Sequence, residues 1–90
     1  MNNKHYKALQ EGIQRARYIR RELAETETEY FPEKVRGLNK AYIGTVKEIM
    51  RQGNLYLDNN PDFWVGLEVA QIVENYSSFL STIDLGRYED

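Results

Sequence analysis

The chain has 90 residues, with 12 Lys and Arg, 14 Asp and Glu, a net charge of -2 and no cysteine. A chain of this length buries roughly 60 to 65% of its unfolded surface, so we expect a single domain over residues 1–90 with a thin core. The absence of cysteine excludes disulfide frameworks, thiol nucleophiles and cysteine-ligated metal sites. Apolar runs are far shorter than the roughly 20 residues of a membrane span, and the polar N-terminus lacks a signal-peptide core. We therefore expect a soluble cytoplasmic protein.

The first predicted element is a long amphipathic helix over about residues 3–29. Its apolar side chains fall within one arc at about 100° per residue. They are Tyr6, Leu9, Ile13, Ala16, Ile19, Leu23 and Ala24. Arg20 lies inside this arc without an acid three or four positions away, and Glu27 follows one heptad later. A lone buried cation is costly, so Arg20 is expected to pair with an acid, reach water or bind an anion. An antiparallel copy would pair Arg20 with Glu27 and specify a homodimer.

The same helix carries a dense polar cluster that we call the arginine cluster. Its members are Arg17, Tyr18, Arg20 and Arg21. Guanidinium groups bind phosphate oxygens in a bidentate geometry, so the cluster predicts a site for a nucleotide or another phosphate compound. Lys40 or Lys47 of a neighbouring subunit would complete it. The alternative is a solvated face on which Arg21 pairs with Glu25.

A second helix is predicted over residues 32–52. Pro32 suits the first helical position, and Gly53 is predicted to end the helix as part of a C-cap. The apolar positions are Val35, Leu38, Tyr42, Val46, Ile49 and Met50. Residues 55–57 are then expected to form a packed connector. A basic stripe on the polar side, comprising Arg36, Lys40, Lys47 and Arg51, favours either a solvated face or, more weakly, nucleic-acid binding.

The third predicted helix covers residues 61–84, with Asn60 as N-cap and Gly86 after its end. Its apolar arc contains Val65, Val69, Ile72, Tyr76, Phe79 and Ile83. Phe63, Trp64 and Leu67 point away from that arc, so one end of the helix is apolar on two sides. Such a helix end is covered by a neighbour or belongs to an interface, and Trp and Phe are frequent interface anchors. Alternatively, the connector 55–57 folds back over these three side chains and covers them.

Together these elements predict an all-α fold. We expect a three-helix antiparallel bundle, built as a long helical hairpin plus a third helix, that self-associates. The uneven distribution of charge is consistent with attraction between a basic and an acidic part of the protein, either within one chain or between subunits. Residues 1–57 carry 11 basic and 7 acidic side chains, whereas residues 58–90 carry 1 and 7.

Catalysis has little support in the sequence. His5 is the single histidine and lies near the N-terminus, so no catalytic triad is expected. The acidic residues Glu22, Glu25 and Glu29 form a ridge without a histidine partner. We therefore expect no enzymatic activity, no metal and no cofactor.

Small size without catalytic motifs is typical of phage and mobile-element accessory proteins, which bind a host factor or a signalling molecule stoichiometrically. We predict a non-enzymatic interaction protein of this accessory or inhibitor type. Its partner, a protein, would bind Phe63, Trp64 and Leu67 or the arginine cluster. The alternative function is an oligomeric binder of a nucleotide-like ligand through the arginine cluster, and nucleic-acid binding is a weaker alternative.

Overall fold

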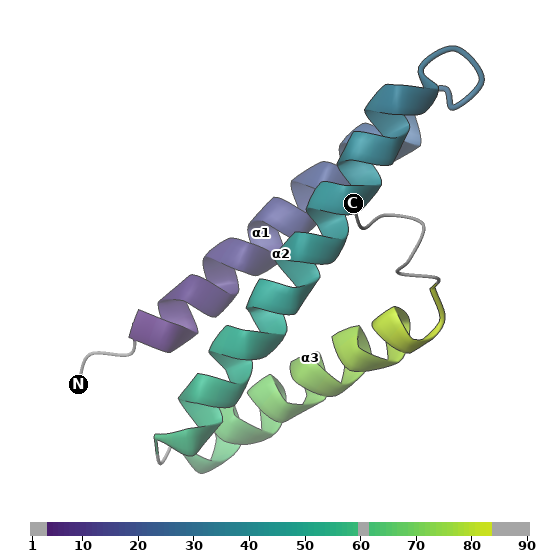
Figure 1. The fold of residues 1–90 in the computed structure, drawn as a ribbon. Coiled ribbons are helices and arrows are strands. Elements are labelled where there is room, and N and C mark those ends of the chain that lie inside the picture. Colours follow the sequence, from purple (N-terminus) through teal and green to yellow (C-terminus); the bar gives the residue numbers. More distant parts are fainter. Residues whose placement is uncertain (1–3, 60–61, 84–90) are drawn as a thin grey trace.

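The computed structural model describes residues 4–59 and 62–83, and these ranges form three α-helices and no strand. Helix α1 spans Lys4–Glu25, α2 spans Pro32–Asp58 and α3 spans Phe63–Ser81. The prediction of an all-α, bundle-like fold is confirmed. Figure 1 shows α2 returning alongside α1, whereas α3 leaves the far end of α2 and diverges from the other two helices. The molecule is elongated, with extents of 47 × 22 × 20 Å.

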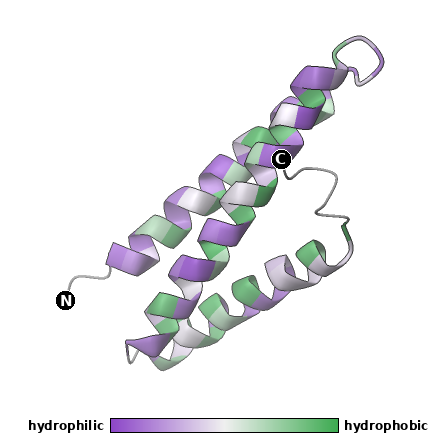
Figure 2. Cartoon of the chain, in the orientation of Figure 1, coloured by the Kyte–Doolittle hydropathy of each residue, from purple (hydrophilic) through white to green (hydrophobic). Residues whose placement is uncertain are grey.

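The core forms where the three helices meet. Its largest fully buried side chains are Leu9 of α1, Val46 and Ile49 of α2, and Val69 of α3. Hydrophobic and hydrophilic residues alternate along α1 and α2, whereas most of α3 is apolar or neutral (Figure 2). The helical spacing of the apolar residues therefore directs one face of α1 and α2 inward, as the sequence predicts.

Helix α1 ends earlier than predicted, at Glu25 instead of residue 29. The hydroxyl of Thr26 donates a 2.7 Å hydrogen bond to the Glu22 carbonyl and caps the last turn. The backbone N–H groups of Tyr30 and Phe31 both donate to the Glu27 carbonyl, which closes a turn before Pro32 begins α2. Glu27 is consequently an exposed loop residue, and the prediction that it continues the apolar stripe of α1 is wrong.

Helix α2 continues past Gly53 to Asp58, so the predicted C-cap and the predicted connector 55–57 are both wrong. Gly53 is buried inside the helix, near its C-terminal end. A Cβ there would overlap the side chain of Val73 and lie 3.5 Å from Val69, both of which belong to α3. The glycine thus permits close packing of α3 and does not terminate α2. Tyr56, in the predicted connector, is buried with its ring centroid 5.5 Å from that of Tyr6.

The N-terminus of α3 is capped by Asp62, whose side chain accepts hydrogen bonds from the backbone N–H groups of Trp64 and Val65 at 3.0 and 3.2 Å. The sequence instead predicted Asn60 as the cap, and Asn60 and Pro61 lie outside the described residues. The helix ends at Ser81, before the predicted residue 84. Gly86, which was expected to follow the helix end, also lies outside the described residues.

Candidate functional site

The N-terminal end of α3 presents a cluster of exposed apolar side chains. The side chains of Phe63, Trp64 and Leu67 are 67, 74 and 52% exposed. The rings of Phe63 and Trp64 meet edge to face, with centroids 5.1 Å apart and planes at 79°. Because residues 55–57 belong to α2, they do not fold back over the cluster. We call these three residues the α3 apolar surface.

The structure separates the arginine cluster into two groups. Arg17 and Arg20 line a cavity, whereas Tyr18 and Arg21 are exposed outside it. The Tyr18 hydroxyl donates a 3.4 Å hydrogen bond to Glu22 on the same helix. Arg20 is exposed, so it reaches water, which is one of the three outcomes expected for a cation within the apolar arc.

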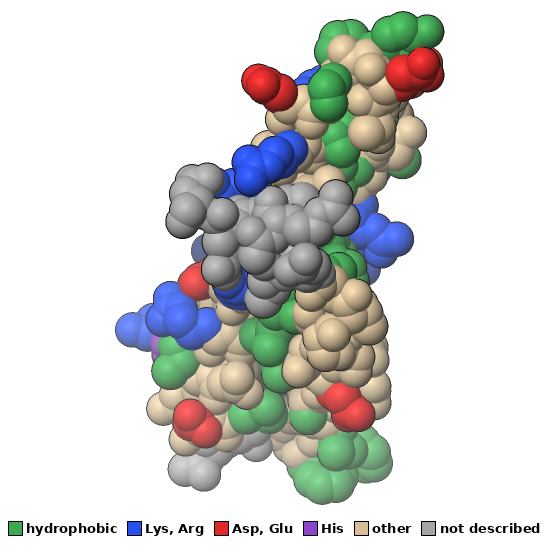
Figure 3. Space-filling model, turned by 45° about the vertical axis from the view of Figure 1, so that its right-hand side comes forward, with side chains coloured by type: hydrophobic (Ala, Val, Ile, Leu, Met, Phe, Trp, Pro, Cys, Tyr) green, Lys and Arg blue, Asp and Glu red, His purple; other side chains and the backbone are tan. Residues whose placement is uncertain are grey.

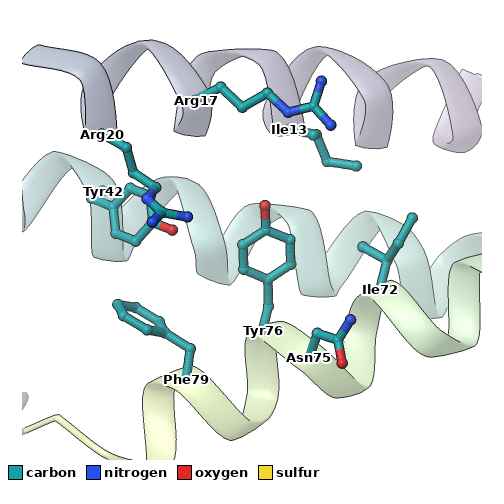
Figure 4. Close-up of a pocket in the computed structure, with 8 residues that line it drawn as sticks. All are labelled: Ile13, Arg17, Arg20, Tyr42, Ile72, Asn75, Tyr76 and Phe79. Carbon is teal, nitrogen blue, oxygen red and sulfur yellow. The ribbon is translucent and has the colours of Figure 1, made fainter.

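The cavity lies between α1, α2 and α3 and has a volume of about 400 Å³. It is lined by Ile13, Arg17, Arg20, Tyr42, Ile72, Asn75, Tyr76 and Phe79. In Figure 4, Arg17 and Arg20 extend from α1, while Tyr76 projects from α3 with its hydroxyl toward α1. Tyr42 and Phe79 form an edge-to-face pair with centroids 5.3 Å apart. The cavity therefore combines two cations with an aromatic wall.

Tyr76 is electrostatically coupled to the other polar groups of this cavity. Partial burial, followed by the proximity of Tyr42, raises the pKa of the Tyr76 phenol. Arg17 and Arg20 act in the opposite direction, because a nearby cation favours the phenolate and lowers that pKa. The hydroxyl keeps its proton at neutral pH and can donate a hydrogen bond to an acceptor in the cavity.

Sequence reasoning missed most of the cavity. Tyr42, Ile72, Tyr76 and Phe79 were assigned to apolar arcs, and Asn75 was assigned no role. A signal was available, because tyrosine places a hydroxyl within an otherwise apolar arc and that hydroxyl usually needs a polar neighbour. Two such tyrosines, Tyr42 and Tyr76, mark the polar part of the cavity.

The predicted basic stripe of α2 lies apart from the cavity, since none of its four residues lines it. Arg51 forms a salt bridge with Glu48 at 2.7 Å, and Gln52 donates to the same carboxylate at 2.8 Å. The hydrogen bond from Arg51, followed by that from Gln52, lowers the pKa of Glu48 to about 2. Arg36, Lys40 and Lys47 each take part in a further interaction. Figure 3 shows basic side chains around the middle of the molecule.

His5 forms a hydrogen bond between two helices. Its Nδ1 atom lies 2.8 Å from the Gln52 side-chain oxygen, which links the start of α1 to the last turns of α2. Within residues 4–59 and 62–83, no group of three or more His, Cys, Asp or Glu side chains could hold a metal ion. None of the helices in that same part of the chain has the length and apolar character needed to cross a bilayer.

Comparison of the chain with models of protein families, with curated proteins and with solved structures finds no match.

Proposed function

We propose that the protein is a non-enzymatic helical interaction protein that binds a protein partner stoichiometrically through the α3 apolar surface. One observation carries the proposal: Phe63, Trp64 and Leu67 lie together on the first two turns of α3 and are more than half exposed. Scattered exposed apolar side chains are normal, but a contiguous aromatic group is typical of an interaction site. Trp and other large aromatic residues are enriched among the residues that dominate binding energy.

The surroundings of the α3 apolar surface indicate the chemistry of the partner. Asp62 precedes the surface and Glu68 follows it, and both are exposed. Figure 3 shows a hydrophobic group at the lower end of the molecule with an acidic side chain beside it. A protein with an apolar groove and Lys or Arg at its rim would complement this arrangement, because rim charges guide association while apolar anchors supply affinity.

Self-association is a second use of the same surface. Two copies of the antiparallel bundle that we propose could bury their α3 apolar surfaces against each other. A homo-oligomer of this kind would compete with binding of the protein partner, since both need Trp64. The two arrangements are distinguished by stoichiometry.

The test places a photoreactive phenylalanine analogue at position 64 and, in a control, at position 18, which is also an exposed aromatic position. We expect irradiation of expressing cells to give a discrete cross-linked product for position 64 only. Mass spectrometry then identifies either a second copy of the chain or a different protein. The identified protein is purified, and calorimetry measures its affinity and stoichiometry with the unmodified chain.

A matched pair of variants decides the outcome. Leu67→Ser should weaken binding of the purified partner at least tenfold, whereas Tyr18→Ser should change it less than twofold. Circular dichroism should show unchanged helicity in both variants. Equal weakening by the two variants, or the same cross-linked products at positions 64 and 18, would contradict the proposal.

A further inference from the structure

We infer that the cavity between the three helices binds a small organic anion with a planar, aromatic body of about mononucleotide size. This inference is independent of the proposed function, because the cavity does not include the α3 apolar surface. Three properties of the cavity support it: the charge of its lining, the chemistry of its walls and its volume.

The charge of the lining selects an anion. Among residues 4–59 and 62–83, Arg17 and Arg20 are the charged residues that line the cavity, and no carboxylate of these ranges lines it. Within the described ranges, neither arginine forms an ion pair with an acidic side chain. The two residues are three positions apart on α1, so their like charges repel each other. A phosphate or carboxylate between them would relieve this repulsion and accept charge-assisted hydrogen bonds.

The side chains that form the walls of the cavity favour a ligand with a planar ring. Figure 4 shows Arg20 extending toward Tyr42 and Phe79, while Ile13 and Ile72 lie at the other end of the cavity. A flat ring can pack against aromatic and aliphatic walls of this kind. The Tyr76 hydroxyl and the Asn75 amide supply hydrogen-bonding groups that would fix the orientation of the ring.

The volume limits the size of the ligand. About 400 Å³ lies near the lower end of the range typical of small-molecule sites, roughly 300 to 1,000 Å³. A nucleoside monophosphate or an aromatic carboxylate is of suitable size, whereas an isolated phosphate ion would leave the aromatic wall unused. The shared chemistry is therefore an anionic group attached to a ring.

The test is calorimetric titration of the full-length protein with four probes: adenosine monophosphate, indole-3-acetate, adenosine and inorganic phosphate. We expect at least one of the first two probes to bind with a Kd below about 1 mM. The neutral nucleoside and the phosphate ion should each bind at least tenfold more weakly, because each lacks half of the recognised chemistry. Tighter binding of the nucleotide identifies a phosphate ligand, and tighter binding of the indole acid identifies a carboxylate ligand.

Variants locate the binding. Arg17→Gln and Arg20→Gln should each weaken binding about tenfold or more, since each removes a charge-assisted contact. Arg21→Gln is the matched control, because Arg21 is an exposed neighbour that does not line the cavity, and it should change the Kd less than twofold. Arg20 is exposed, so its variant should melt at the temperature of the parent protein.

Three results would overturn the inference. The first is a Kd above about 1 mM for both aromatic anions. The second is binding of adenosine as tight as that of its monophosphate, which would remove the role of the arginines. The third is an equal loss of affinity in Arg21→Gln and Arg20→Gln, which would show attraction by general positive charge and not by this cavity.

Discussion

Gly53 lies near the C-terminal end of α2, at the point where α3 packs closely against it. The Cβ of an alanine at this position would overlap Val73 and contact Leu9 at 3.6 Å. Gly44 provides a contrast within the same helix, because it is exposed and a Cβ there would meet no atom within 4 Å. The same residue type therefore has a packing role at one position and none at the other.

We expect Gly53→Ala to lower the free energy of unfolding by roughly 1 to 3 kcal/mol, because the overlap forces α2 and α3 apart. Gly44→Ala should raise it by up to about 1 kcal/mol through improved helix propensity. Urea denaturation of both variants measures the difference. Stabilisation by Gly53→Ala would show that α3 does not pack closely at this position.

Glu48 makes a pH-dependent contribution to stability. Its pKa is lowered to about 2 in the folded protein, from an ordinary value of 4.5, chiefly by the hydrogen bond from Arg51. A lowered carboxyl pKa contributes stability that is fully present above about pH 4.5 and is lost as the pH falls toward 2. The pair is solvent exposed, so screening keeps the contribution small.

Glu48→Gln should therefore lower the melting temperature at pH 7 by a few degrees at most, and the difference from the parent protein should vanish as the pH approaches 2. It should also shrink in 1 M salt. Glu11→Gln is the control, because Glu11 is exposed and forms no ion pair within the described residues. Thermal melts between pH 2 and 7 provide the measurement. A difference that persists unchanged at pH 2 would refute the assignment.

At the scale of the helix, α3 depends on its N-cap. The Asp62 carboxylate accepts the two backbone hydrogen bonds at the start of the helix and also interacts favourably with the helix dipole. This cap holds the turn on which Trp64 lies. The geometry of the α3 apolar surface and the stability of α3 are therefore linked.

Asp62→Ala should reduce the free energy of unfolding by about 1 kcal/mol, since it removes both hydrogen bonds. Asp62→Asn should lose less, because the amide oxygen can still accept them. Hydrogen exchange at the amides of Trp64 and Val65 should be faster in the alanine variant than in the asparagine variant. Equal stability of the alanine variant and the parent protein would show that the cap does not hold the helix start.

At the scale of the whole molecule, the buried and exposed apolar residues have different roles. Leu9 is fully buried among the three helices, whereas Trp64 is 74% exposed. Burial stabilises the folded chain, and exposure leaves an apolar side chain available to a partner. A pair of truncations separates these roles.

Leu9→Ala should lower the free energy of unfolding by about 2 to 5 kcal/mol, because it removes buried methyl groups and leaves a cavity. Trp64→Ala should change it by less than about 0.5 kcal/mol. Urea denaturation followed by circular dichroism measures both, since it does not need the tryptophan signal. A large loss in Trp64→Ala would assign that side chain to the core and contradict its role in binding.

Local features of the sequence were sufficient to determine the three helices. Pro32 begins α2 as predicted, because its fixed φ and missing N–H suit the first helical position regardless of tertiary contacts. The position of Phe63, Trp64 and Leu67 outside the apolar arc of α3 also follows from their spacing, whereas their exposure was left open until residues 55–57 proved to be helical. Periodicity and hydropathy are properties of neighbouring residues, so the sequence by itself determined these features.

Only the tertiary structure decided the end of α2 and the composition of the cavity. A glycine after an apolar stretch can either cap a helix or allow another helix to pack closely. Gly53 allows close packing, because Val73 of α3 approaches it. Likewise, the cavity is lined by residues of all three helices, so the meeting of Arg17 and Arg20 of α1 with Tyr76 of α3 depends on how the helices pack. These outcomes depend on the angle between helices, which is set by contacts between residues far apart in the chain.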